Sequence, residues 1–403
     1  MDMPVLLFVY NDVSQVPIPI ANHLWLACEV GFRSIIANCK CIKMSNGALE
    51  LSKAIEILSE TQTRRLPDGY RLVPTIIIHR QFMDASSEEL ISHIARDIHG
   101  VLISYHPIWK TLASKWSAEL CFRNGERSGI HVARPTTFLV EKANLKKLRA
   151  IGLIRQLILK PSHSYECNGI LISTPATFDR VIQTAARSKY KQYVVQEVIT
   201  DGVLLRGCRF DIRIYVIITS IRPPKFTILR NGVVKMAGTP VDPKMSGIRS
   251  ALLTGSNYRR HNGHRITDIS LASFFQTMSG NEVHKRRFWE RVEQLIQNVV
   301  ECYAIDPSVA SAGDLDGRFL LVGVDILLQQ TADEERILFL ESNYAPSLVE
   351  WGLSIDRDLA FIHREWLRIL YSLYKQPITG DAQVRFTHMP SFQSSEQCEL
   401  VPH

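Results

Sequence analysis

The first 110 residues alternate between unbroken apolar runs and segments with helical spacing. Buried strands are predicted for the apolar runs at 4–10, 34–39, 73–79 and 100–105. The spacing over 86–98, which begins with serines, predicts a helix. Strands that alternate with helices over short links are typical of α/β units with a parallel sheet. We therefore expect an N-terminal α/β domain over residues 1–110.

The next segment, 111–206, shows a smaller and mixed pattern. Strands are predicted at 133–140, 156–160, 169–173 and 193–199, and helices at 142–151 and 177–188. A polar loop, 162–168, separates the second and third of these strands. This succession differs from that of the first domain, so we assign 111–206 to a separate domain.

The C-terminal part, 207–375, contains the longest apolar strand patterns. Strands are predicted at 208–219, 226–237, 319–328 and 336–342, and amphipathic helices at 287–304 and 358–375. Within the second of these strand segments, Asn231-Gly232 is a hairpin signal. Together these elements predict an α+β domain over 207–375. The Pro-, Ser- and Gln-rich segment 376–403 is expected to be a disordered tail.

Composition narrows the class of protein. Hydrophobic residues make up 46% of the 403 residues and charged residues 22%, which is ordinary globular usage and excludes a mostly disordered, collagen-like or coiled-coil chain. The net charge of +7 suits an anionic ligand such as a nucleotide or an acidic peptide, and is too weak to indicate nucleic acid. The eight cysteines form no CxxC pair, so we expect reduced thiols and a cytoplasmic location. No apolar run reaches the roughly 18 residues that a membrane span needs.

Three oxygen-bearing side chains interrupt or end the last two predicted strands. Asp325 stands inside an apolar run, where a carboxylate is costly to bury without a cationic partner. Glu341 ends the next apolar run, and Asn343 leaves the chain on the same side two residues later. A hairpin would set the strands side by side, so the three can converge on Mg²⁺, which prefers hard oxygen ligands and keeps positions open for phosphates. The alternative is a set of strand-end side chains that face solvent.

The first strand of the C-terminal part carries its charges on one face. Charged residues and one tyrosine recur there with period two: Arg209, Asp211, Arg213 and Tyr215. The pattern fits an active-site wall and, equally well, a solvated sheet face with ion pairs along the strand. Lys160 ends a strand beside the polar loop, where it could hold phosphates. As single residues, Lys160 and Lys115 are weak signals.

The residues above occur in an order that resembles a known family. Across about 110–352 the chain resembles ATP-grasp enzymes and, within them, the tubulin–tyrosine-ligase-like amino-acid ligases. The similar stretches are ILKPSHSYECNGILI (158–172), YVVQEVI (193–199), GCRFDIRIYVIIT (207–219), ALLTGSNY (251–258), FLLVGVDILL (319–328) and FLESNYAPSL (339–348). The resemblance implies an ATP-grasp fold that follows an N-terminal α/β domain.

The resemblance also implies roles in nucleotide binding. Lys160 would contact the α- and β-phosphates of ATP, and Lys115 falls where the family places an earlier phosphate-binding lysine. The adenine pocket would be lined by Gln196 and by the backbone of Glu197, Val198 and Ile199.

Roles in catalysis and metal binding follow from the same resemblance. Arg209, Asp211 and Arg213 would face the γ-phosphate and the acyl intermediate, with Asp211 also within reach of the ribose or the amino substrate. Lys235 occupies a position that is usually arginine, on the wall that meets the acceptor carboxylate. One or two Mg²⁺ ions, with Mn²⁺ as an alternative, would be held by Asp325, Glu341 and Asn343.

The implied reaction is amide formation through an acyl phosphate. We expect an ATP-dependent, ADP-forming carboxylate–amine ligase that joins an amino acid or amine to a carboxylate, such as that of an acidic peptide or protein tail. The alternatives are a small-molecule kinase of the inositol-phosphate type and a nucleotide-binding protein without turnover. The last alternative stays open because Ser164–Asn168 replaces most of the usual phosphate-loop glycines and Thr254-Gly255 replaces a usual Thr-Asn. Neither nucleic acid nor a membrane is expected as a partner.

Overall fold

The computed structural model describes residues 3–10, 27–45, 48–58, 62–72, 74, 76–79, 90, 93–94, 102–104, 111–112, 114–164, 167–241, 249–255, 262–263, 268–278, 282–307, 319–332, 334–344, 346 and 364–372. The tail expected at 376–403 and most of the helix predicted at 86–98 lie outside these residues. Within them, no helix is long and apolar enough to cross a membrane.

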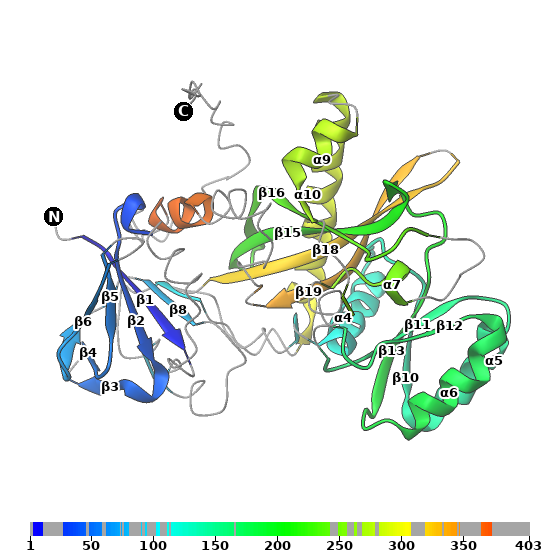
Figure 1. Cartoon of the computed structure of the whole chain (residues 1–403), viewed down its shortest axis with the longest axis horizontal. Coiled ribbons are helices and arrows are strands. Elements are labelled where there is room, and N and C mark those ends of the chain that lie inside the picture. Colours follow the sequence, from blue (N-terminus) through cyan, green and yellow to red (C-terminus); the bar gives the residue numbers. More distant parts are fainter. Residues whose placement is uncertain are drawn as a thin grey trace.

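The N-terminal part forms two sheets, at the left of Figure 1. The larger sheet has the order β6-β5-β2-β1-β8-β9, from β1 (Val5–Tyr10), β2 (Arg33–Asn38), β5 (Ile55–Ile57), β6 (Thr63–Arg65), β8 (Ile76–His79) and β9 (Leu102–Ile103). The predicted parallel pairing is confirmed for β2, β1, β8 and β9, whereas β5 and β6 add antiparallel strands at one edge. The smaller sheet joins β3 (Ile42–Ser45), β4 (Ala48–Leu51) and β7 (Tyr70–Leu72), and a 3-10 turn, η2 (Cys39–Cys41), precedes it.

A four-stranded antiparallel sheet follows, at the lower right of Figure 1. Its order is β10-β13-β11-β12, from β10 (Thr137–Glu141), β11 (Leu157–Pro161), β12 (Leu171–Ser173) and β13 (Gln192–Glu197). One face packs on α5 (Arg149–Gly152), α6 (Phe178–Arg187) and the 3-10 segment η3 (Lys142–Leu148), and a short 3-10 segment, η4 (Pro175–Thr177), precedes α6. This face has a hydrophobic core of its own, to which Leu157, Leu159, Tyr193 and Val195 contribute. The alternating residues, Lys160 and Gln196 among them, therefore lie on the opposite face.

The sheet with the longest strands, called the largest sheet below, occupies the centre of Figure 1. Its order is β17-β16-β15-β18-β19, with β14 paired to β15; the strands are β14 (Leu204–Leu205), β15 (Cys208–Ser220), β16 (Lys225–Met236), β17 (Ile269–Ser270), β18 (Leu320–Gln330) and β19 (Glu335–Tyr344). Its helices are α4 (Lys115–Arg127), α7 (Arg249–Leu252), α9 (Leu271–Thr277) and α10 (Glu282–Ile305). On one face, Phe210, Ile212 and Ile214 pack in a core shared with α4, α9 and α10. The predicted alternation along β15 is thereby confirmed.

The other face of the largest sheet changes character along its length. Tyr215 and Ile217 are completely buried against residues of the N-terminal sheet and of the helical segment 364–372. Two hydrogen bonds join the sheets directly: Phe319 N donates to the carbonyl of Ile103 (2.9 Å), and the hydroxyl of Tyr344 donates to the carbonyl of Ser104 (3.1 Å). Tyr215 therefore belongs to the core, although it shares a face with Asp211 and Arg213.

The hairpin predicted at Asn231-Gly232 is wrong. Both residues lie inside β16, which runs without interruption to Met236. The connection between β15 and β16 falls earlier, between Ser220 and Lys225. Near Asn231-Gly232 the register shifts between Ile214 and Val216, so the dipeptide accompanies a β-bulge. The glycine is required here by space, since a Cβ atom at Gly232 would lie 2.4 Å from the carbonyl oxygen of Arg213.

Candidate functional site

A row of charged side chains crosses four neighbouring strands of the largest sheet. In the strand register, Lys235 of β16 lies opposite Asp211 of β15, and Arg213 lies opposite Asp325 of β18. Asp325 in turn lies opposite Glu341 of β19. Side chains at directly opposite positions share a face of the sheet. The structure thus brings together five residues that the sequence had singled out, from four separate strands.

Asp325 is the centre of this row. Its side chain is only 3% exposed, and the guanidinium of Arg213 donates to both carboxylate oxygens, with Nη2 2.8 Å from Oδ2. Lys235 Nζ lies 3.0 Å from Oδ2 as well. Burial alone would raise the pKa of Asp325, but the charges of Arg213 and Lys235 outweigh it and lower the pKa. The sequence predicted one cationic partner for this buried carboxylate, and the structure has two, Arg213 and Lys235.

Gly323 gives Arg213 the space to reach Asp325. A Cβ atom at this position would lie 2.7 Å from Arg213 Cδ and 2.8 Å from Pro346 Cβ. Nonbonded carbon atoms do not approach so closely, so a larger residue would displace Arg213. Gly323 was not among the residues expected at the site. A glycine inside a strand pattern often marks a close approach, and Gly323 in FLLVGVDILL carried that signal.

The first residue of α4 adds a cation from outside the sheet. Ser114 caps this helix, and its hydroxyl accepts a hydrogen bond from the N–H of Ser117 at 3.2 Å. Lys115 Nζ lies 3.3 Å from Glu341 Oε2 and donates to the carbonyl of Ser164 at 2.9 Å. Lys115 therefore ties the polar loop of the four-stranded sheet to β19.

The carboxylate of Glu341 lies among cations from several parts of the chain. Burial would raise its pKa, but the charges of Lys115 and Lys160, followed by those of Lys235 and Arg213, lower the pKa of Glu341 to about 2. The group is therefore ionised at neutral pH. Its side chain keeps 27% exposure, in contrast to Asp325, so a ligand can reach it.

Lys160 approaches the row from the four-stranded sheet. Burial lowers the pKa of its ammonium group, the charge of Glu341 opposes this, and the charge of Lys115 adds to it. No hydrogen bond or ion pair to this ammonium group occurs in the part of the chain that the structure describes. The Lys160 side chain is half-buried, and a partly desolvated cation without a direct partner gains most from an anionic ligand.

Asp211 differs from the other two carboxylates of the row. It is 7% exposed, and its Oδ2 lies 3.4 Å from Lys235 Nζ. Burial raises the pKa of Asp211 to about 6, against the opposing charge of Lys235 and with the added charge of Asp325. Its other oxygen, Oδ1, has no hydrogen-bond partner among the described residues. This oxygen is therefore a candidate acceptor for a hydroxyl or amino group of a ligand.

Replacing Asp211 by asparagine is expected to change how stability depends on pH. Because the folded-state pKa of Asp211 is about 6, the folded protein keeps a proton that the unfolded chain releases between about pH 4 and pH 6. As the pH rises through this window, the wild type should lose stability relative to Asp211→Asn, by at most about 1.4 kcal/mol per pH unit. Urea unfolding of both proteins across the window measures this. A stability difference that is independent of pH would contradict it.

The residues expected at the adenine pocket lie at the end of β13 and just beyond it. Gln196 is buried, and its Nε2 donates to Thr137 Oγ1 of β10 at 3.1 Å. The side chain of Glu197 forms an ion pair with an exposed arginine. The backbone N–H of Val198 donates to the carbonyl of Gln156 at 3.0 Å. This segment thus lies beside the start of β11, on the same sheet as Lys160.

Arg209 contacts this adenine-side segment and not the charged row. Its Nη1 donates to the carbonyl of Ile199, and burial lowers the pKa of the guanidinium. Period two grouped Arg209 with Asp211 and Arg213. Among the described residues, only Asp211 and Arg213 are joined to the row, through Lys235 and Asp325. A long side chain at the start of a strand can turn away from the face that its Cβ suggests.

The proposed metal ligands form a hard-oxygen set. Asp325 and Glu341 lie opposite each other, and Asn343 follows on the same face of β19. The Nδ2 of Asn343 donates to Asp325 Oδ2 at 3.3 Å. The described residues contain no group of three or more His, Cys, Asp or Glu side chains that could hold a metal. An ion here would therefore rest on two carboxylates, one amide and ligand phosphates, a set that fits Mg²⁺.

The polar loop between β11 and β12 contacts the segment that contains Thr254. Arg249 Nη2 of α7 donates to the carbonyl of Cys167 at 3.3 Å. Cys167 has a backbone φ of 59°, an angle at which glycine is more usual. Burial raises the pKa of its thiol, which disfavours the thiolate form at neutral pH. Arg249 was not predictable from the sequence, because a lone arginine on a short helix carries no signal.

The fold and this site define a class of protein. A model of the tubulin-tyrosine ligase family matches residues 120–360, more than half of the chain. The chain therefore belongs to the tubulin–tyrosine ligase family, which is part of the ATP-grasp superfamily. The matched residues include the charged row, Lys160 and Asn343, and they begin after Lys115. The resemblance noted in the sequence is confirmed.

Individual relatives are more distant. A human probable tubulin polyglutamylase, TTLL2, is 27% identical over 229 residues, which cover 53% of this chain and 36% of the relative. The human tubulin polyglutamylase TTLL7 is 28% identical over 174 residues, 38% of this chain and 19% of the relative. The human tubulin monoglutamylase TTLL4 is 24% identical over 180 residues, 40% of this chain and 14% of the relative. The match thus spans little more than a third of these relatives' length at most.

Proposed function

We propose that this chain is an ATP- and Mg²⁺-dependent ligase that joins an amino acid to a carboxylate of a peptide or protein, releasing ADP and phosphate. The observation that carries the proposal is the charged row. Around the oxygen set of Asp325, Glu341 and Asn343, four cations converge from four elements: Lys115, Lys160, Arg213 and Lys235. Such a concentration of buried and half-buried charge is costly, and a ligand of high negative charge would offset that cost.

The proposed nucleotide site lies between two sheets, as in an ATP-grasp fold. Lys115 contacts both the carbonyl of Ser164, just beyond β11, and Glu341 of β19. This supports a site in which the face of the four-stranded sheet that carries Lys160 lies toward β19. On this face, Lys160 would contact the phosphates of ATP and the segment from Gln196 to Ile199 would contact the adenine. Residues 1–110, 111–206 and 207–375 are the corresponding domains in this proposal.

The residues of the row would divide the chemistry between them. Mg²⁺, when bound, would offset the charge of the phosphates. Lys115, Lys160 and Arg213 would stabilise the negative charge that develops when a substrate carboxylate attacks the γ-phosphate, by position and electrostatics. Lys235 would orient the acceptor carboxylate. The Oδ1 atom of Asp211, which has no hydrogen-bond partner in the described structure, would accept a hydrogen bond from the incoming amine.

The relatives suggest which substrates to test. Their descriptions name glutamylation of tubulin. We therefore propose glutamate as the amino acid and an acidic protein tail as the acceptor, with tubulin as the first one to try. The cytoplasmic location expected from the cysteines stays a prediction. Six cysteines of the described residues are free thiols.

A product assay tests the proposed function. The purified chain is incubated with ATP, Mg²⁺, glutamate and a glutamate-rich peptide. The mass of the peptide is then measured by mass spectrometry. The ligase predicts peptides heavier by whole glutamate residues, together with ADP and free phosphate in equal amounts. A phosphorylated product without free phosphate would indicate the small-molecule kinase. ATP binding without turnover on any amine and carboxylate pair would indicate a protein that only binds the nucleotide.

Replacing Lys160 by alanine is expected to weaken ATP binding at least about tenfold, the loss of one charge-assisted phosphate contact. The ammonium group has no competing partner among the described residues, so the effect should appear directly in the affinity. Calorimetry with a non-hydrolysable ATP analogue measures it. Lys146→Ala is a matched control, because Lys146 is exposed in the same part of the chain. Unchanged affinity in Lys160→Ala would exclude the phosphate role.

A further inference from the structure

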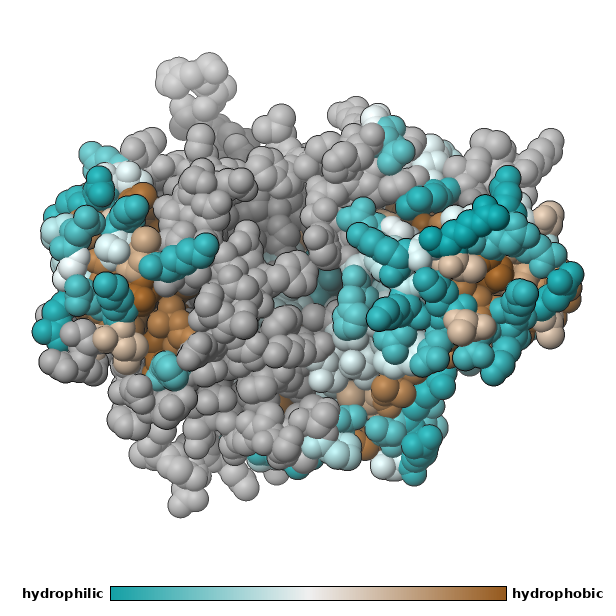
Figure 2. All heavy atoms as spheres, turned by 90° about the horizontal axis from the view of Figure 1, so that it is seen from below, coloured by the Kyte–Doolittle hydropathy of each residue, from teal (hydrophilic) through white to brown (hydrophobic). Residues whose placement is uncertain are grey.

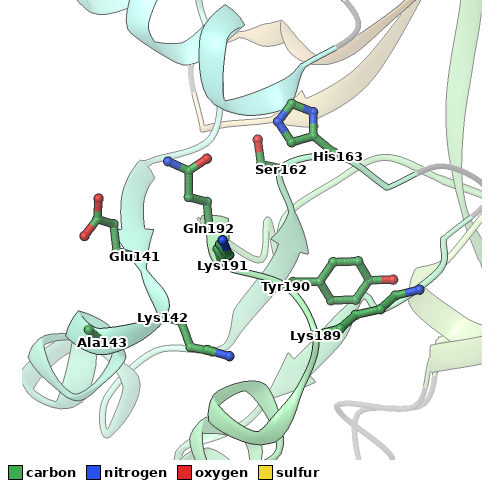
Figure 3. Close-up of a pocket in the computed structure, with 9 residues that line it drawn as sticks. All are labelled: Glu141, Lys142, Ala143, Ser162, His163, Lys189, Tyr190, Lys191 and Gln192. Carbon is green, nitrogen blue, oxygen red and sulfur yellow. The ribbon is translucent and has the colours of Figure 1, made fainter. Parts of the chain in front are cut away.

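A pocket of about 780 Å³ opens at one edge of the four-stranded sheet. It is formed where β10 and β11 end and where β13 begins (Figure 3). Its walls are lined by Glu141, Lys142, Ala143, Ser162, His163, Lys189, Tyr190, Lys191 and Gln192. None of these residues belongs to the charged row. The pocket is therefore separate from the proposed catalytic site, although Ser162 and His163 lie in the loop that follows Lys160.

The walls of the pocket are held in place by backbone contacts. The N–H of Ser162 donates to the carbonyl of Gln192 at 3.0 Å, and the N–H of Lys142 donates to the carbonyl of Lys191 at 2.8 Å. The hydroxyl of Ser162 is buried and lies 3.4 Å from that of Ser114, the capping residue of α4. These contacts fix the three strand ends relative to one another, so the pocket is preformed.

Positive charge dominates the lining, with three lysines and one glutamate. Lys142 Nζ donates to the carbonyl of Ser188 at 3.1 Å. Lys189 Nζ lies 5.6 Å from the ring centre of Tyr190, and Lys191 is exposed. Neither Lys189 nor Lys191 forms an ion pair within the described ranges. Two ammonium groups at the start of β13 are therefore available to an anionic partner.

The type of cation indicates the type of anion. Arginine, which recognises phosphate by two parallel hydrogen bonds, is missing from the nine lining residues. Lysines act as separate point charges on long flexible stems, which suits carboxylates spaced along a peptide. The half-buried ring of Tyr190 offers an apolar surface for the methylene groups of such side chains. Seen from below, the surface over the part of the molecule that holds this sheet is mostly hydrophilic (Figure 2).

We propose that this pocket is a docking site for a carboxylate-rich polypeptide segment, outside the catalytic site. The proposal rests on the proposed function only for its suggestion that this segment belongs to the acceptor. Tyr190 also contacts Gly169 at the end of the polar loop. A docked segment would therefore lie against the loop whose other end follows Lys160.

Peptide binding without turnover tests the proposal. A short fluorescent oligoglutamate peptide is titrated with the full chain, in the presence of Mg²⁺ and a non-hydrolysable ATP analogue, and anisotropy is recorded. The double variant Lys189→Glu/Lys191→Glu should bind at least about tenfold more weakly, because each substitution replaces an attraction by a repulsion. The matched control is Lys146→Glu/Lys147→Glu, with the same charge change at exposed residues of η3 that do not line the pocket. It should bind within about twofold of the wild type.

Three results would overturn the proposal. One is no measurable binding of the peptide to the wild-type chain, and another is equal weakening in the two double variants, which would show general attraction to a basic surface. The third is tighter binding of a single-stranded oligonucleotide of the same charge that is lost in the same variant, which would make the site one for nucleic acid. Nucleotide-induced thermal stabilisation should be unchanged in both variants. Because the assay needs no turnover, failure of docking and failure of the ligase function are distinguishable.

Discussion

Replacing Glu341 by glutamine is expected to lower Mg²⁺-dependent turnover at least about 100-fold, a loss typical of removing one preorganised electrostatic group. Glutamine keeps the shape of the side chain but removes a charge that lies among Lys115, Lys160, Lys235 and Arg213. It also removes one of the two carboxylates in the oxygen set. Release of phosphate from ATP, measured against Mg²⁺ concentration, gives the size of the loss.

The control for this variant lies on the same strand. Glu335→Gln makes the same chemical change at the first residue of β19, far along the strand from Glu341, and should keep turnover near the wild-type value. Both variants should unfold in a single cooperative transition. This would show that a loss of turnover comes from the site and not from misfolding. Wild-type turnover in Glu341→Gln would show that this carboxylate is not a metal ligand. In that case the ion, if one binds, rests on other groups.

Replacing Arg213 by methionine is expected to lower the free energy of unfolding by about 3–5 kcal/mol, the usual cost of breaking a buried ion pair from one side. Asp325 would stay buried, with a side chain 3% exposed, and only Lys235 and the amide of Asn343 would remain beside its oxygens. Methionine fills a similar space, so most of the loss comes from the uncompensated charge. Urea unfolding at neutral pH measures it.

A second variant shows whether the cost belongs to the pair. In Arg213→Met/Asp325→Leu both charges are gone, and apolar side chains of similar size occupy the same space. Stability should recover most of the loss seen in Arg213→Met, because replacing both partners of a buried pair is often neutral or stabilising. Two single-variant losses that simply add in the double variant would mean that Arg213 and Asp325 do not interact energetically. The double variant should have no ligase activity in either case.

Long strands with one apolar face were predictable from the sequence, whereas several short strands of the N-terminal part and helix α4 were not. β15, β18 and β19 each have ten or more residues, so alternation is repeated often enough to be recognised. The strands β3 to β7 have three or four residues each, too few to show a period. Helix α4 was missed because it contains Asn124-Gly125, which reads locally as a turn. Its glycine is needed for packing, since a Cβ there would lie 2.2 Å from Cys302 Sγ.

The charged row was predictable because it lies on two pairs of neighbouring strands. Period two put Asp211 and Arg213 on one face, and the hairpin of β18 and β19 brought Asp325 to Glu341. The contact of Lys115 with Glu341 was not predictable from the sequence, because it depends on where α4 crosses the sheet. The pocket beside β13 was missed for the same reason. Its lysines come from separate strand ends, and each one looks like an ordinary surface residue when the sequence is taken alone.

The four-stranded sheet has a hydrophobic core that is separate from those of the other sheets. A unit with its own core can move as a rigid body relative to its neighbours. It can also unfold locally, as hydrogen exchange detects, without unfolding of the rest of the chain. Lys160 and Gln196 lie on this unit, whereas Asp325 and Glu341 lie on the largest sheet. A nucleotide held by both would bind only the closed arrangement, so its apparent affinity depends on the fraction of molecules that are closed. Substitutions in the core beneath α6, far from any ligand, would then alter nucleotide affinity by changing that population.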